Sequence, residues 1–136
     1  MDVTAVDTSR FEEMIGVMES VAKHKRDRTV EESDTKFYEL MAAYNRRALE
    51  AKGEGKMVVA HTVMVPNEIL YAMDIIPFQL DNAANTMVTS LRNQEEVFGI
   101  AKEFGFVPDL CSAHRAQTAM GIKGWYPQVD AVVWSH

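Results

Sequence analysis

The chain has 136 residues, of which 47% are hydrophobic and 25% are charged, and its formal net charge is −6. This negative charge argues against a nucleic-acid-binding protein. No apolar run reaches the roughly 18 to 20 residues of a membrane span. The N-terminus lacks the basic start and apolar centre of a signal peptide. The single cysteine excludes an internal disulfide, so the sequence favours a protein of the reducing cytoplasm.

The first third of the chain predicts two amphipathic helices. In TSRFEEMIGVMESVAKHK, with Thr8 or Ser9 as the N-cap, the apolar residues at helical spacing are Phe11, Met14, Ile15, Met18 and Val21. After EESD, with Ser33 or Asp34 as the N-cap, one face of the second helix carries Phe37, Leu40, Met41, Tyr44 and Leu49. We expect this helical extension, residues 9–52, to dock a partner subunit or a neighbouring domain.

After the glycines of KGEGK, the pattern changes to strands alternating with helices. KMVVAHTVMV (56–65), IIPFQL (75–80) and DAVVWSH (130–136) predict strands, the first and last of them buried. Pro66 opens a short helix, PNEILYAMD, and DNAAN (81–85) predicts a loop. Further helices are predicted from about Thr89 to Phe104 and from about Ser112 to Gly121.

These elements predict an α/β fold with a mostly parallel sheet and an α-helical N-terminal extension. We place the extension at residues 1–55 and a partial α/β domain at residues 56–136. The sequence stops at Ser135-His136, directly after a predicted strand. Because ligands of open α/β sheets usually bind beyond the carboxyl ends of the strands, we expect the chain to be truncated after this strand.

Cys111, in PDLCSAHRAQTAMG, allows four interpretations. Free cysteines are among the most buried residues, so it could be a small core side chain. A thiolate at a helix N-terminus could instead be a nucleophile, with His114 or His61 as base. Cys111 and His114 form a C-x-x-H pair that could bind zinc if His61 and His136 joined it. An iron–sulfur cluster would require further thiolates from outside this chain.

Three stretches resemble the component D family of 2-hydroxyacyl-CoA dehydratases, which includes the benzoyl-CoA reductase subunits. GKMVVAHTVMVPNEILYAMDIIPF is similar to the family's first strand, proline-led helix and second strand. PDLCSAHRAQTAMG resembles the segment with the first cluster cysteine, and VDAVVWSH resembles the strand before the second. The resemblance covers about residues 50–136.

The resemblance implies a flavodoxin-like domain and a [4Fe-4S] cluster with Cys111 as one ligand, the remaining ligands lying outside this chain. It implies radical dehydration of (R)-2-hydroxyacyl-CoA to enoyl-CoA, with a second subunit and an ATP-dependent activator that supplies a low-potential electron. Ring reduction by a benzoyl-CoA reductase-type subunit is the alternative within the family. A non-catalytic α/β binding module and a thiol-dependent enzyme stay open as further alternatives.

The resemblance also identifies site candidates at the strand ends. His61 and Thr62 end the first strand and Gln79 ends the second, where family members place polar groups near substrate or cluster. Histidine and glutamine depart from the family pattern, and both could simply hydrogen-bond strand-end backbone.

Other candidates each have a structural alternative. Glu68 could be catalytic or contact CoA, or could only favour the helix N-terminus. Arg115 could face a CoA phosphate or the cluster, or form a surface ion pair. Asp81, Asn82 and Asn85 are expected to shape a turn. Trp125 and Tyr126 could form a pocket wall or a subunit contact, or could simply pack in the core.

Overall fold

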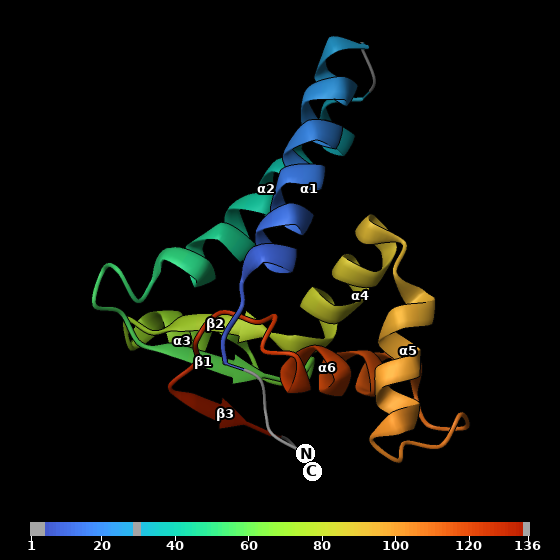
Figure 1. Cartoon of the computed structure of the whole chain (residues 1–136). Helices are drawn as coiled ribbons and strands as arrows, with labels where there is room; N and C mark the ends of the chain where they lie inside the picture. Colours follow the sequence, from blue (N-terminus) through green and yellow to red (C-terminus); the bar gives the residue numbers. More distant parts are fainter. Residues whose placement is uncertain (1–4, 29–30, 135–136) are drawn as a thin grey trace.

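The structure, a computed structural model, describes residues 5–28 and 31–134, which form six helices and a three-stranded parallel sheet (Figure 1). The elements in chain order are α1 (Ser9–Asp27), α2 (Glu32–Glu50), β1 (Val58–His61), α3 (Asn67–Ala72), β2 (Ile76–Gln79), α4 (Leu80–Leu91), α5 (Gln94–Glu103), α6 (Ser112–Ile122) and β3 (Ala131–Val133). The α/β class and the helical N-terminal part are therefore confirmed. No helix in the described ranges combines the length and the apolar character needed to cross a membrane.

The sheet has the strand order β2-β1-β3, so β1 is its central strand. All four residues of β1 are buried, as the sequence predicted for a strand covered on both faces. The predicted strand 56–65 is shorter in the structure, because the chain turns at 63–65 before α3 begins. β3 differs from its prediction, since all three of its residues are exposed at the sheet edge.

The helices α1 and α2 form a hairpin that projects from the sheet (Figure 1). The buried face of α1 contains four of the five predicted residues, Phe11, Met14, Ile15 and Met18. On the outside, ion pairs such as Lys25–Asp34 (2.7 Å) join the two helices.

The prediction for α2 needs two corrections. Its N-cap is Glu31, so Ser33 and Asp34 lie inside the helix. Phe37 and Leu40 are each 58% exposed. The buried residues of α2 are instead Ala42, Asn45 and Ala48. Met41, Tyr44 and Leu49 of the predicted face are partly buried, so only its N-terminal part, Phe37 and Leu40, faces solvent.

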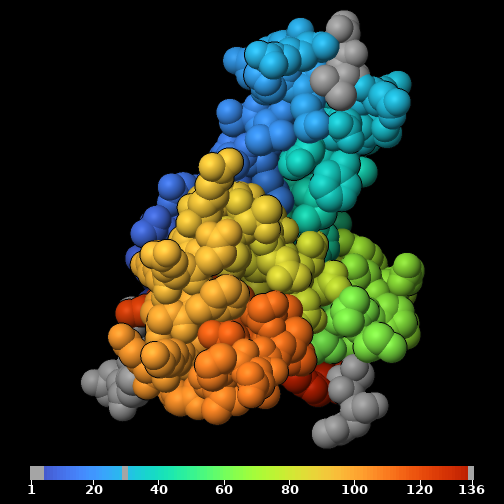
Figure 2. All heavy atoms as spheres, turned by 90° about the vertical axis from the view of Figure 1, so that its right-hand side faces the viewer, coloured from blue at the N-terminus to red at the C-terminus, as the bar shows by residue number. Residues whose placement is uncertain are grey.

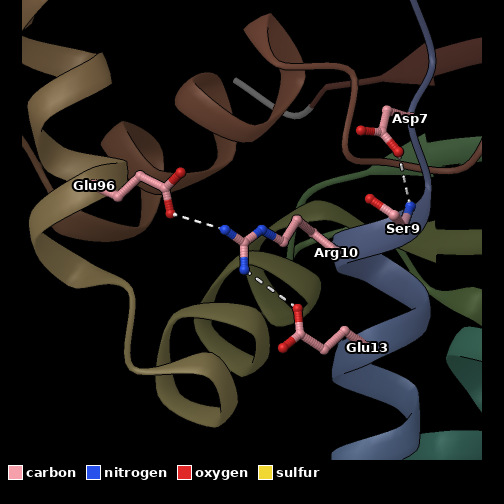
Figure 3. Close-up of polar contacts among 5 residues, drawn as sticks. All are labelled: Asp7, Ser9, Arg10, Glu13 and Glu96. Atoms are coloured by element: carbon pink, nitrogen blue, oxygen red, sulfur yellow. Dashed lines mark hydrogen bonds and ion pairs between the residues drawn. The ribbon is translucent and has the colours of Figure 1, made fainter.

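The base of the hairpin belongs to the same apolar core as the sheet. The Phe11 ring of α1 packs edge-on against Phe78 of β2, with 5.7 Å between the ring centroids. Arg10 forms ion pairs with Glu13 in α1 and with Glu96 in α5 (3.7 Å; Figure 3). One core therefore spans both sides of the boundary that we placed at residue 55.

The segment after β2 also differs from its prediction. DNAAN is not a loop but the first turns of α4, because Ala83, Ala84 and Met87 bury one helical face in the core. This burial outweighs the preference of Asn and Asp for turns. The predicted helix from Thr89 to Phe104 is interrupted at Arg92, which adopts a left-handed conformation (φ 52°) between α4 and α5. Figure 2 shows α4, α5 and α6 packed together on one side of the molecule.

Candidate functional site

The carboxyl ends of the three strands meet at one edge of the sheet. In the strand register, His61 lies opposite Gln79 on one side and opposite Val133 on the other. The fold therefore brings the two predicted residues His61 and Gln79 to neighbouring positions. This edge is where open α/β sheets usually bind their ligands.

His61 is only 1% exposed and is held by the backbone. Its Nδ1 lies 2.7 Å from the carbonyl oxygen of Thr62, so Nδ1 carries the proton and donates it. Its Nε2 is buried and has no hydrogen-bond partner among the residues that the structure describes. This is the strand-end backbone bond that the sequence allowed as the alternative to proton transfer.

Gln79 connects the sheet to α2. Its backbone N–H donates to the hydroxyl oxygen of Tyr44 at 2.8 Å. Burial raises the pKa of Tyr44 to about 12, so the phenol stays protonated at neutral pH. The side chain of Gln79 lines a cavity of about 460 Å³ between α2, α3, β2 and α4.

Cys111 is a free and exposed thiol at the N-cap position of α6. The interpretation of Cys111 as a small core residue is therefore wrong. The physical reason is its place in the chain: residues 107–112 are exposed, and the buried face of α6 starts only at Ala116. A thiol in this position is accessible to a metal, a cluster or an electrophile.

The first turn of α6 lies beside the end of β3. The rings of His114 and Trp134 have centroids 6.2 Å apart. His114 follows Cys111 by three residues, about 4.5 Å along a helix axis. Cys111 therefore lies near the carboxyl edge of the sheet, on the side of β3.

The zinc interpretation has no further support in the geometry. Among residues 5–28 and 31–134, no three side chains of His, Cys, Asp or Glu are grouped as metal ligands would be. His136, the fourth histidine considered for such a site, lies outside the described residues.

Arg115 stabilises the segment that leads to Cys111. Its Nη1 donates to the carbonyl oxygen of Pro108 at 3.2 Å, and its guanidinium lies 4.8 Å from the centre of the Phe98 ring in α5. It makes no ion pair with the residues described here, so the predicted surface ion pair is not what orders it. This contact between α5, α6 and the 108–111 turn could not be read from the sequence.

The other candidates have structural roles or stand apart. Glu68 is exposed in the first turn of α3, where its charge favours the helix N-terminus. Asp81 accepts a hydrogen bond from the N–H of Val63 at 3.1 Å and so fixes the turn after β1, although Asp81 itself lies in α4. Trp125 is buried in the core.

Asn82, Asn85 and Tyr126 are held within the fold. The Asn82 amide lies 3.8 Å from the sulfur of Met41, and the carbonyl of Asn85 accepts the Thr89 hydroxyl inside α4. Tyr126 packs on Phe78, with 5.5 Å between the ring centroids.

Sequence reasoning missed Arg47 as part of a site. Its guanidinium lies 5.1 Å from the centre of the Tyr71 ring, at the cavity that Gln79 and Tyr44 also line. Tyr44 was placed on the apolar face of its helix, but nothing in the spacing connected it with Gln79, 35 residues later.

Comparison with known proteins identifies no relative: no family model matches the chain, and neither the curated proteins nor the solved structures contain a match.

Proposed function

We propose that the chain is part of a cytoplasmic iron–sulfur enzyme subunit that acts on CoA thioesters, of the 2-hydroxyacyl-CoA dehydratase type. The reaction is radical dehydration of (R)-2-hydroxyacyl-CoA to enoyl-CoA, with a second subunit and an ATP-dependent activator as partners. The proposal rests on the resemblance of three stretches, quoted above, and on one structural observation: Cys111 is exposed at the start of α6, near the carboxyl edge of the sheet.

The position of Cys111 suits a cluster ligand. The N-terminus of a helix favours a nearby negative charge, such as that of an iron–sulfur cluster. The side chain needs no rearrangement to become accessible, since it is exposed already. Arg115 holds the preceding turn against α5, so the thiolate would be presented from an ordered segment.

Cys111 is the chain's only cysteine, so these 136 residues can supply one thiolate ligand. The remaining ligands of a [4Fe-4S] cluster would come from outside this sequence. The contact between His114 and Trp134 brings the end of β3 to the first turn of α6. When bound, such a cluster supplies one-electron transfer at low potential.

Anaerobic reconstitution with iron and sulfide tests this proposal, on this chain and on the product of its full natural reading frame. We expect the full product to bind about four irons with acid-labile sulfide and to show the absorption and EPR spectra of a [4Fe-4S] cluster. Cys111→Ala should abolish this binding, and the matched variant Ser112→Ala, at the next exposed position, should retain it.

Two results would contradict the proposal. A full product that folds and binds no iron would favour the non-catalytic module. A hydrolase or transferase activity that needs no iron and is lost on alkylation of Cys111 would favour a thiol enzyme. If iron binds, assays with 2-hydroxyacyl-CoA and with benzoyl-CoA separate dehydration from ring reduction.

A further inference from the structure

The cavity of about 460 Å³ beside Gln79 has walls that are fixed by contacts between four elements. Tyr44 of α2 accepts the N–H of Gln79 in β2, and Arg47 of α2 lies over Tyr71 of α3. The amide nitrogen of Asn82 in α4 lies 3.8 Å from the sulfur of Met41 in α2. The cavity is open to solvent on one side, and its volume lies within the range of small-molecule sites. It borders the carboxyl end of β2, the edge at which parallel sheets usually bind ligands.

The charge of the cavity is opposite to that of the whole chain. The net charge of the chain is −6, yet the cavity lining contains one cation, Arg47, and no acidic residue. Arg47 has no carboxylate partner among the described residues, whereas its neighbour Arg46 pairs with Glu19 (Nε–Oε1 3.1 Å). The central carbon of the Arg47 guanidinium lies 5.1 Å from the centre of the Tyr71 ring, a cation–π contact that uses none of its N–H groups. Among the described residues no hydrogen bond uses these N–H groups, so they are available for an anion.

Tyr44 adds a second hydrogen-bond donor. Its oxygen accepts the N–H of Gln79, and within the described part of the chain its own O–H has no acceptor. The raised pKa of Tyr44, caused first by burial, keeps that proton in place well above neutral pH. Arg47 and Tyr44 are three residues apart on α2, within one helical turn, and both residues line the same cavity.

The remaining lining determines the class of anion. Leu40, Met41 and Ala43 give the cavity apolar walls, and Tyr71 gives it an aromatic one. A phosphate group carries nearly two charges and is usually held by several cations or by a cluster of backbone N–H groups. One arginine and one phenol match a single carboxylate, and the apolar walls match a hydrocarbon body next to it.

From this geometry we propose that the cavity between α2, α3, β2 and α4 binds a small monocarboxylate with an apolar body, with Arg47 and Tyr44 as its carboxylate ligands. Gln79 and Asn82 also line this cavity, and both residues carry amide side chains that can donate and accept hydrogen bonds. This site does not use Cys111, so it goes beyond the function proposed above and does not depend on it.

The test is a titration of the isotopically labelled chain with phenylacetate, followed by backbone amide NMR at constant ionic strength. The N–H of Gln79, which donates to Tyr44, is the reporter. We expect saturable shifts at Gln79 and along α2 with a millimolar dissociation constant, typical of a ligand of this size. Phenylacetamide, the neutral analogue, should bind about tenfold more weakly.

Variants of α2 test whether the charge of Arg47 binds the carboxylate while the fold stays intact. Arg47→Gln should weaken phenylacetate binding about tenfold or more, Arg47→Lys should weaken it less, and Tyr44→Phe should weaken it a few fold. Arg46→Gln, at the next position on α2, is the matched control and should leave binding unchanged, as should Cys111→Ala. Dispersed amide spectra of each free variant show that it is folded.

Three outcomes would overturn the proposal. The first is no chemical-shift change near Gln79 up to about 20 mM phenylacetate, well above the millimolar range expected. The second is equal affinity for phenylacetamide, and the third is an equal loss of phenylacetate affinity in Arg46→Gln and Arg47→Gln. Tighter binding of inorganic phosphate at the same amides would replace the carboxylate by a phosphate ligand and also count against it.

Discussion

β1 and β3 are neighbouring parallel strands that are both rich in Val and Ala, yet their environments are opposite. Every residue of β1, which lies between β2 and β3, is buried, whereas every residue of the edge strand β3 is exposed. The difference lies in position and not in composition. An apolar run therefore predicts a strand, but only its neighbours in the sheet determine how much burial stabilises it.

The largest expected loss in the free energy of unfolding comes from truncating Phe78, a core residue of the sheet. Phe78 in β2 is fully buried and packs edge-on against Phe11 and Tyr126. Phe78→Ala should lower the free energy of unfolding by about 3–5 kcal/mol, because it removes apolar burial and leaves a cavity. Urea denaturation followed by circular dichroism measures this change.

The control for Phe78 is Phe104→Ala, because Phe104 is about half exposed and stacks only on Phe106. It should cost about 1 kcal/mol or less. Equal losses for the two variants would contradict the burial of Phe78 in the core.

A matched pair of valines tests the contrast between the two strands directly. Val58 in β1 is fully buried and Val132 in β3 is 57% exposed. Val58→Ala should cost about 2 kcal/mol, because two methyl groups leave the core, and Val132→Ala about 0.5 kcal/mol or less. Thermal and urea unfolding of both variants give the two values. A loss of about 2 kcal/mol at Val132 would show that β3 is covered in solution.

Asp130 connects these two strands, and its effect should depend on pH. Its carboxylate accepts the N–H of Val58 at 2.7 Å and pairs with Lys52, and these bonds, Lys52 first, lower its pKa below the ordinary value of 3.8. A lowered folded-state pKa stabilises the fold above the unfolded-state value, and this stabilisation is lost as pH falls through the folded-state value.

Asp130→Asn should therefore reduce stability at neutral pH and flatten the loss of stability below about pH 4. Unfolding curves at several pH values measure this dependence. Asp109→Asn, at an exposed turn residue with no ion pair among the described residues, is the control and should leave the pH profile unchanged. An unchanged profile for Asp130→Asn would mean that neither the Lys52 pair nor the bond from the Val58 N–H forms in solution.

Local sequence patterns predicted whether a segment is a helix or a strand better than they predicted what packs around it. The periodicity of α1 identified its buried face, and Pro66 marked the start of α3. DNAAN failed as a loop because its Asn and Asp residues were given more weight than the helical spacing of Leu80, Ala83, Ala84, Met87 and Leu91, which form the apolar face of α4. In the same way, Arg92 ends α4 in a left-handed backbone conformation, which an arginine side chain does not predict.

The candidate site was predictable only in part, for the same reason. Strand ends are local features, so His61 and Gln79 could be placed at one edge in advance. The exposure of Cys111 and the contact of Arg115 with Phe98 depend on how α5 and α6 pack. The cavity of Arg47 and Tyr44 depends on four elements that are distant in the sequence, so it could be found only in three dimensions.

The smallest expected effect concerns α2, where exposure again contradicts composition. Phe37 is 58% exposed, and its nearest aromatic contact is Tyr38 (5.4 Å), whereas Phe11 in α1 is fully buried. Phe37→Ala should change the free energy of unfolding by about 0.5 kcal/mol or less, and Phe11→Ala should lower it by about 3–5 kcal/mol. If Phe37→Ala instead cost more than about 2 kcal/mol, and the cost rose with protein concentration, self-association would bury this face of α2. Denaturation at two protein concentrations separates the two cases, because the unfolding of a monomer does not depend on concentration and that of a dimer does.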